Sequence, residues 1–193
     1  MRIVGGEFRG RPLAGPRGMA VRPTSDRLRE TLFNILQHAY GLPKPETRVL
    51  DLFAGTGALG LEALSRGAAS ALFVELGVEG RGLIRRNIEA LGLGGRTRIL
   101  RRDATRLGPA GTLAPFDLAF CDPPYRKGLG VEALASAAAG GWLTPGAVCV
   151  LEEAAEAEID LGAGFAVLDR RDAGDTQLLF IVSQRCSPYG SCS

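Results

Sequence analysis

The chain has 193 residues, 46% of them hydrophobic, and a formal net charge of +2 at pH 7. This length and composition fit one compact domain with a sizeable core. No apolar run is long enough to span a membrane, and the opening MRIVGGEFRG lacks the apolar segment of a secretion signal, so we expect a cytoplasmic protein.

Positive charge is concentrated near the N-terminus. Residues 1–30 contain seven arginines against three acidic residues, so the rest of the chain is slightly acidic. Because a guanidinium group matches phosphate oxygens and stacks on bases, this region favours an RNA or DNA substrate. A general bias toward arginine, with 21 arginines and two lysines in the chain, is the alternative explanation. The candidate RNA contacts are Arg2, Arg9, Arg11, Arg22, Arg27 and Arg29.

Residues 1–46 are predicted to form a small extension made of a hairpin and a helix. Weak alternation and a Gly-Gly pair indicate a short hairpin over 2–13. A proline followed by Thr-Ser-Asp signals a helix start, and apolar residues at helical spacing predict a helix over about 24–40. Residues 41–46 contain two prolines and are expected to be a linker.

A strand, a glycine-rich turn and a helix are predicted over residues 47–66. The apolar run ending at Phe53 is typical of a strand buried on both faces of a parallel sheet. Gly55, Gly57 and Gly60 then form G-x-G-x-x-G, which lets the backbone approach a ligand and the next helix pack closely. Free amides at the start of that helix would face the ligand. This stretch therefore predicts a nucleotide-cofactor turn.

A second strand over 71–76 carries an acidic residue near its end, and a helix over 78–91 follows. Glu75 lies 20 residues after Gly55, where a carboxylate accepts hydrogen bonds from ribose hydroxyls. An acidic residue stabilised by the N-terminus of the next helix is the structural alternative. The glycine pattern followed by this acid also fits a turn that binds NAD or FAD, so these two features do not identify the cofactor.

A third strand over 97–100 is followed by another carboxylate, Asp103. At this position the side chain could accept a hydrogen bond from an adenine amino group, while Ala104 packs beside the ring. The structural alternative is an Asx turn after the strand.

The motif Asp122-Pro123-Pro124-Tyr125 follows a fourth predicted strand, over 116–121. It should therefore lie at the same sheet edge as the glycine turn. Near that turn, Asp51 provides a carboxylate that suits an amide or ammonium group better than a pyrophosphate. D-P-P-Y beside such a turn resembles the signature of S-adenosylmethionine-dependent amino-methyltransferases, and a rigid turn with a capping aspartate is the alternative.

The remaining chain is predicted to complete the sheet. A helix over 130–139 and a strand over 147–151 precede two strands over 165–168 and 177–182, which we expect to be antiparallel. The pattern predicts an α/β fold, the Rossmann-like seven-stranded sheet of class I S-adenosylmethionine-dependent methyltransferases, over 47–184. Residues 185–193 are predicted to be a disordered tail. No C-x-x-C pair suggests zinc, so no metal is expected.

Five segments of the chain share one further resemblance: RIVGGEFRGRPL, RPTSDRLRETLFNIL, LDLFAGTGALGLEALSRGA, CDPPYRKGL and GWL. Together they resemble the RsmD family of 16S rRNA (guanine(966)-N(2))-methyltransferases. They occur in the family's order and spacing, and RPTSDRLRETLFNIL is the most specific of them. The similarity extends over about residues 2–183, and the tail after Gln184 does not fit.

The resemblance implies methylation of the exocyclic N2 of one guanine in the assembled or assembling small ribosomal subunit. Orientation would replace a strong base, because Asp122 and the Pro123 carbonyl can accept the two amine hydrogens. Tyr125 would stack on the extruded base. We expect a monomer. The implied cofactor residues are Asp51, Phe53, Ala54, Gly55, Gly57, Glu75, Asp103 and Ala104.

Two other classes of function remain open at this point. An NAD-dependent oxidoreductase would explain the glycines and Glu75 but neither Asp51 nor the D-P-P-Y loop. A non-catalytic RNA-binding module would explain the arginines alone. Among methyltransferases, DNA adenine or cytosine N-methylation and protein glutamine methylation use a similar loop, so the loop does not identify the base.

Overall fold

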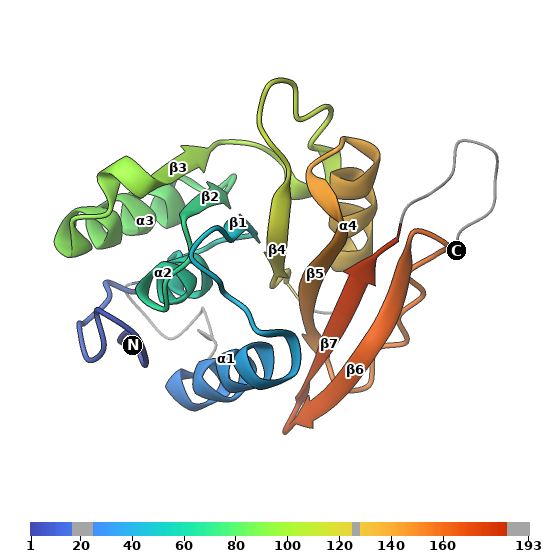
Figure 1. The fold of residues 1–193 in the computed structure, drawn as a ribbon, viewed down its shortest axis with the longest axis horizontal. Helices are drawn as coiled ribbons and strands as arrows, with labels where there is room; N and C mark the ends of the chain where they lie inside the picture. The colour runs from blue at the N-terminus through green and yellow to red at the C-terminus, as the bar shows by residue number, and fades with distance from the viewer. Residues whose placement is uncertain (17–24, 125–127, 185–193) are drawn as a thin grey trace.

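A computed structural model describes residues 1–16, 25–124 and 128–184, and within them seven strands form one sheet (Figure 1). The strand order is β3-β2-β1-β4-β5-β7-β6. Pairing is parallel from β3 to β5, whereas β7 is antiparallel to both β5 and β6. The strands are β1 Arg48–Leu52, β2 Ser70–Val74, β3 Thr97–Leu100, β4 Phe116–Cys121, β5 Leu143–Ala154, β6 Phe165–Ala173 and β7 Thr176–Ser183. The predicted seven-stranded α/β sheet with an antiparallel end is confirmed.

Helices cover both faces of the sheet. One buried cluster joins the sheet to α1, α2 and α3, and a second joins the opposite face to α4 (Figure 1). In β1, Val49 belongs to the first cluster while Leu50 and Leu52 belong to the second, so the strand is buried on both faces as predicted. The helices are α1 Asp26–Tyr40, α2 Ala58–Ser65, α3 Val78–Leu91 and α4 Leu129–Ala139, with short 3-10 turns η1 Gly94–Arg96 and η2 Ala104–Arg106.

Local capping explains where α1 begins and ends. The Ser25 hydroxyl accepts a hydrogen bond from the Leu28 amide at 3.1 Å, which satisfies one of the free amides of the first turn. Gly41, with φ of 63°, ends the helix in the left-handed conformation. The helix predicted over about 24–40 is therefore confirmed to within two residues.

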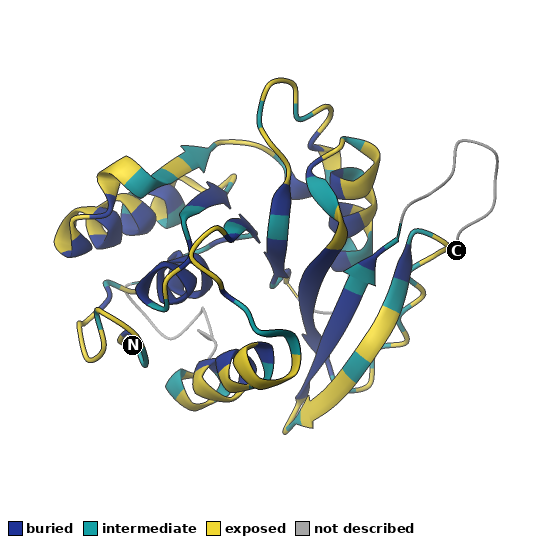
Figure 2. Ribbon diagram, viewed as in Figure 1, coloured by how far each residue is buried: buried dark blue, intermediate teal, exposed yellow. Residues whose placement is uncertain are grey.

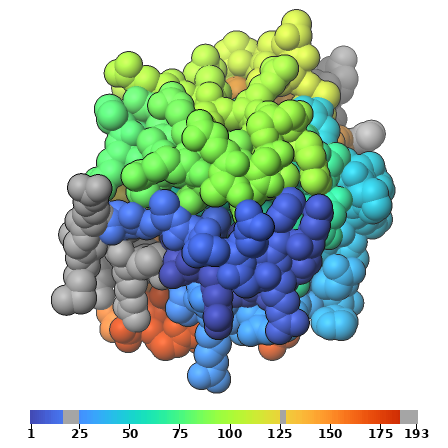
Figure 3. Space-filling model, turned by 90° about the vertical axis from the view of Figure 1, so that its left-hand side faces the viewer, coloured from blue at the N-terminus to red at the C-terminus, as the bar shows by residue number. Residues whose placement is uncertain are grey.

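The N-terminal segment, residues 1–16, folds back on itself as the predicted hairpin, with one antiparallel bridge between Arg2 and Pro12. Three backbone hydrogen bonds cross the hairpin, from the Ile3 amide to the Arg11 carbonyl at 2.9 Å, from Gly10 to Ile3 at 2.8 Å and from Leu13 to Met1 at 3.1 Å. Ile3 is fully buried in the same cluster as Phe73 and Phe120, so this segment packs onto the sheet domain. Figure 3 shows the N-terminal residues, in blue, lying against the green residues that include α3. The division of the chain at residue 46 stays a prediction.

The last two strands are longer than their apolar runs predicted. β6 continues through the charged residues Arg170, Arg171 and Asp172, which are exposed because β6 is the edge of the sheet (Figure 2). Backbone pairing with β7 extends the strand where side-chain hydrophobicity gives no signal. The predicted tail over 185–193 lies outside the described residues. No helix in the described parts of the chain is long and apolar enough to cross a membrane.

Candidate active site

The predicted cofactor and substrate residues follow neighbouring parallel strands at one edge of the sheet. The glycine turn follows β1, Glu75 follows β2, Asp103 follows β3 and Asp122 follows β4. Since β1 lies between β2 and β4, this edge is the point where the strand order reverses, and open α/β sheets bind ligands at such points.

The glycine turn is held in conformations that ordinary side chains rarely adopt. Gly55 and Gly57 have φ of 55° and 77°, and Phe53, just before them, has φ of 56°. At Gly60 an added Cβ would lie 2.5 Å from the Phe73 ring, so the close packing of α2 on β2 requires glycine there. The unusual conformation of Phe53 was not predicted, and a bulky residue gives no sequence signal for it.

Asp51 lies beneath this turn. Its side chain is 2% exposed, and Oδ2 accepts a hydrogen bond from the Gly60 amide at 2.9 Å. Burial raises the pKa of this carboxyl from 3.8 to about 8; the Gly60 hydrogen bond lowers the pKa, and the nearby charge of Glu75 raises it. In this arrangement Asp51 joins β1 to the start of α2, and its contact with a cofactor stays a prediction.

The Glu75 carboxylate connects the glycine turn to α3. Oε2 accepts from the Gly55 amide at 2.8 Å and Oε1 accepts from the Gly77 amide at 2.6 Å. Gly77 is the N-cap residue of α3. The bond from the Gly77 amide therefore matches the structural alternative for Glu75, an acid stabilised by a helix N-terminus, whereas the bond from Gly55 does not. Gly80 leaves space for this side chain, because a Cβ there would lie 2.9 Å from the Glu75 carboxyl carbon.

Asp103 forms the Asx turn that the sequence offered as the alternative to adenine contact. Oδ1 accepts from both the Thr105 hydroxyl, at 2.7 Å, and the Thr105 amide, at 2.9 Å. These two bonds lower the pKa of the carboxyl. Ala104 is buried. Oδ2 of Asp103 has no hydrogen-bond partner among the described residues, so a ligand contact is compatible with the turn.

An exposed apolar residue next to Glu75 was missed by the sequence reasoning. The strand predicted over 71–76 ends at Val74, and Leu76, two residues later, is 57% exposed. Its signal in the sequence is an apolar residue directly after Glu75, the acid that follows β2. Together, the Glu75 and Asp103 carboxylates and the apolar surface of Leu76 fit the ribose and adenine of an adenosyl group, so the residues present suit S-adenosylmethionine.

The D-P-P segment is fixed by the packing of α4. Asp122 is half-buried, Pro123 is buried and Pro124 is exposed, while Tyr125 lies outside the described residues. A Cβ on Gly130 would lie 2.4 Å from Leu151 and 3.2 Å from Pro123, so the first turn of α4 contacts both. Strand pairing of Leu52 with Cys121 places the start of the glycine turn beside Asp122.

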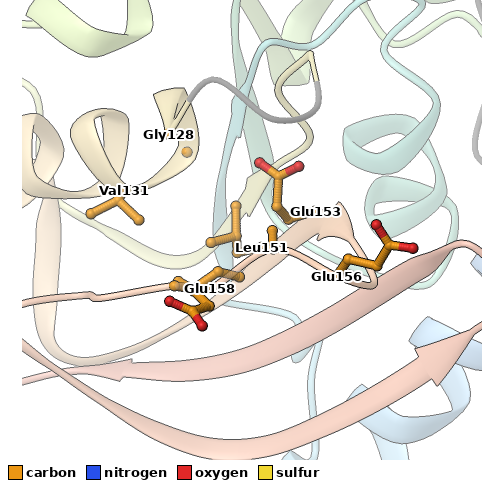
Figure 4. A pocket seen from close by; sticks show the side chains of 9 residues that line it. Gly128, Val131, Leu151, Glu153, Glu156 and Glu158 are labelled. Carbon is orange, nitrogen blue, oxygen red and sulfur yellow. The ribbon is translucent and has the colours of Figure 1, made fainter.

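A cavity of about 390 Å³ lies beside this segment, between the start of α4 and the end of β5 (Figure 4). Apolar Val131, Leu151 and Ile159 and acidic Glu153 and Glu156 are among its lining residues.

The loop at one side of this cavity is held by a buried side chain. Gln177 donates from Nε2 to the carbonyls of Ala154 at 2.7 Å and Ala157 at 2.9 Å.

The described residues contain no group of three or more histidine, cysteine, aspartate or glutamate side chains that could hold a metal ion.

The arginines of the N-terminal region divide into exposed and buried positions. Arg2, Arg9, Arg11 and Arg27 are exposed, and Arg22 lies outside the described residues.

For Arg29 the RNA-contact prediction is wrong. Its side chain is 0% exposed, pairs with Asp26 at 2.8 Å and donates to the Arg2 carbonyl, so it joins α1 to the N-terminal segment. The positive charge of residues 1–30 gave no means of distinguishing it from exposed neighbours.

Comparisons with known proteins agree with this geometry. The family described as "Conserved hypothetical protein 95" matches residues 1–182. The Ribosomal RNA small subunit methyltransferase D of Escherichia coli K12 is 40% identical over 81% of this chain and 76% of the relative, and the protein of that name from Haemophilus influenzae is 30% identical over 90% and 89%. A solved structure of the putative methyltransferase yhhF from E. coli has a TM-score of 0.79 at 32% identity and covers 95% of this chain and 97% of its own.

Proposed function

Given that this chain belongs to the RsmD family, we propose that it is an rRNA methyltransferase. In our proposal it transfers a methyl group from S-adenosylmethionine to the exocyclic N2 of a guanine in 16S rRNA of the small ribosomal subunit. The observation that carries the proposal is the pairing of β1 with β4, which brings the glycine turn and the D-P-P segment side by side.

Residues of three strand ends would hold the cofactor. The Glu75 carboxylate, near the backbone of the glycine turn, is suited to ribose hydroxyls. Leu76 offers an exposed apolar surface for adenine, and Asp103 has an oxygen available for the adenine amino group. When bound, S-adenosylmethionine supplies a methyl group activated by its sulfonium charge.

The D-P-P segment would orient the nucleophile. Guanine N2 is a weak nucleophile because its lone pair is delocalised into the ring. Asp122 and the Pro123 carbonyl can accept the two amine hydrogens and direct the lone pair toward the methyl group. The tight packing of Pro123 against α4 would keep these acceptors in place. Tyr125 would provide a stacking surface for the base.

Exposed arginines of the N-terminal region would contact rRNA phosphates. Arg2, Arg9, Arg11 and Arg27 are solvent-accessible, and Arg22 is retained in the proposal from the sequence. Arg29 is removed from it because it is buried. We propose that the substrate is the small subunit or an assembly intermediate, and that the enzyme acts as a monomer.

Mass spectrometry of rRNA from cells with and without this chain tests the proposal. We expect loss of one N2-methylguanine in 16S rRNA, and its return when the purified protein and S-adenosylmethionine are added to the undermethylated subunits. Loss of the methyl group from a different base would show that the enzyme modifies that base and would contradict the assignment to guanine N2. Unchanged rRNA and no transfer in vitro would refute the function.

A further inference from the structure

We propose that Asn87 is a positioning residue that fixes the N-terminal segment relative to the glycine turn. The inference rests on the proposed function, in which the segment contributes RNA contacts and the turn contributes to cofactor binding. Asn87 lies in α3, is 1% exposed and was not singled out in the sequence.

The side-chain amide of Asn87 makes three hydrogen bonds, all to backbone. Oδ1 accepts from the Ala14 amide at 2.7 Å. Nδ2 donates to the Ala14 carbonyl at 3.1 Å and to the Thr56 carbonyl at 2.9 Å. Both hydrogens of the amide nitrogen are therefore used. Ala14 belongs to the N-terminal segment, whereas Thr56 lies between Gly55 and Gly57.

Other contacts keep the same two regions together. The Thr56 hydroxyl lies 3.8 Å from the Met1 sulfur, within sulfur hydrogen-bond distance. Arg11 donates to the Ala90 carbonyl at 2.9 Å, three residues along the chain from Asn87 in α3. The segment thus runs against α3, as Figure 3 shows, and reaches the glycine turn through the buried Asn87 amide and through the contact of Met1 with Thr56.

This geometry couples two backbone positions that sequence separates by 42 residues, Ala14 and Thr56. A buried amide that loses one partner leaves a polar group unsatisfied, and the remaining bonds reorganise. A shift of Ala14 therefore changes the hydrogen bonds of the Asn87 side chain, which also donates to the Thr56 carbonyl. The position of bound RNA and the shape of the cofactor turn become linked through Asn87.

A second anchor of the N-terminal segment provides a matched control. The Ser65 hydroxyl donates to the Gly5 carbonyl at 2.6 Å and accepts from the Phe8 amide at 2.9 Å. Ser65 is buried at the end of α2 and has no hydrogen bond to the glycine turn among the described residues. Its loss loosens the segment without removing a bond from the turn.

Three variants test the link: Asn87→Ala, Ala14→Pro and Ser65→Ala. Proline at position 14 removes the N–H that donates to Asn87 Oδ1, and the substitution shortens no core side chain. We would measure the Kd for S-adenosylmethionine by calorimetry, the KM and kcat for undermethylated small subunits, and Tm for each variant.

We expect Asn87→Ala and Ala14→Pro each to raise both the cofactor Kd and the subunit KM about three- to tenfold, the scale of one hydrogen bond. Ser65→Ala should raise the subunit KM and leave the cofactor Kd unchanged.

Specific outcomes would overturn the inference. A lower Tm with unchanged Kd and KM in Asn87→Ala, assayed below its transition, means that Asn87 is structural only. An unchanged cofactor Kd in Ala14→Pro means that the segment and the turn are independent, even if Asn87→Ala is misfolded. Absence of methyl transfer by the unmodified protein would instead refute the proposed function, and the inference with it.

Discussion

At the scale of single residues, the three candidate cofactor carboxylates have hydrogen-bond partners inside the protein. Glu75 accepts from two backbone amides, Asp103 from Thr105 and Asp51 from Gly60. The sequence predicted that these carboxylates lie at or just after strand ends at one edge of the sheet, because strand ends can be located from apolar runs. The Asx turn of Asp103 and the helix N-terminus beside Glu75 were among the alternatives that the sequence offered. The bonds of Glu75 to Gly55 and of Asp51 to Gly60 were not predicted, because they depend on the turn conformations that Phe53 and the glycines adopt.

The Asp122→Ala variant is expected to fold and to bind S-adenosylmethionine but to lose turnover. Loss of one preorganised polar partner typically costs on the order of 10²–10³ in rate. Single-turnover methylation of undermethylated subunits measures the effect, and calorimetry with the cofactor is the control. A near-normal rate would contradict the orienting role.

A pH dependence of stability follows from the buried Asp51. Its pKa is raised to about 8 in the folded protein from an ordinary 3.8, so the folded state binds the proton more tightly than the unfolded state. The resulting stability is fully present below pH 3.8 and is lost as the pH rises through about 8. In the Asp51→Asn variant this contribution is absent, while an oxygen acceptor for Gly60 remains.

Denaturant unfolding of both proteins at several pH values checks this expectation. The free energy of unfolding of wild type relative to Asp51→Asn should fall between about pH 4 and 8, by up to about 1.4 kcal/mol per pH unit. A difference independent of pH would show that Asp51 is ionised in the folded protein.

At the scale of elements, the sequence described the N-terminal segment only in part. Its alternation predicted the hairpin, but not the hydrogen bonds of its backbone to Glu62, Ser65 and Asn87. Such long-range partners leave no local pattern. In contrast, α3 and β4 have the predicted bounds, because helical spacing identifies α3 and an apolar run interrupted only by Asp117 identifies β4.

Charge reversal of the exposed Arg9 and Arg11 to glutamate is expected to raise the KM for small subunits. It should also flatten the dependence of binding on salt, since phosphate contacts act by counterion release. Titration of binding at several salt concentrations gives the slope. The matched control is the exposed Arg98 in β3, reversed to glutamate, which should change both quantities less. An unchanged slope in the Arg9 and Arg11 variant would exclude them as phosphate contacts.

At the scale of the whole molecule, the topology favours a methyltransferase over an NAD-dependent oxidoreductase. A G-x-G-x-x-G turn with an acid 20 residues later fits both, as Gly55 and Glu75 show. The D-P-P segment on the adjacent strand has a role only in the first.

We therefore expect S-adenosylmethionine to raise the Tm and NAD to leave it unchanged. At 100 times Kd a ligand of the folded state contributes about 2.7 kcal/mol. Thermal unfolding with each cofactor measures this, and stabilisation by NAD alone would reverse the assignment.

The pairing of β1 with β4 also determines how the reaction should respond to mutation. Neighbouring strands lie about 4.8 Å apart, a spacing fixed by backbone hydrogen bonds and independent of which side chains fill the core. The separation between the glycine turn and the D-P-P segment is therefore set by backbone pairing, since Leu52 and Cys121 are register partners. Core substitutions should lower the fraction of folded enzyme while each folded molecule keeps its rate. Change at this sheet edge, by contrast, alters catalysis directly.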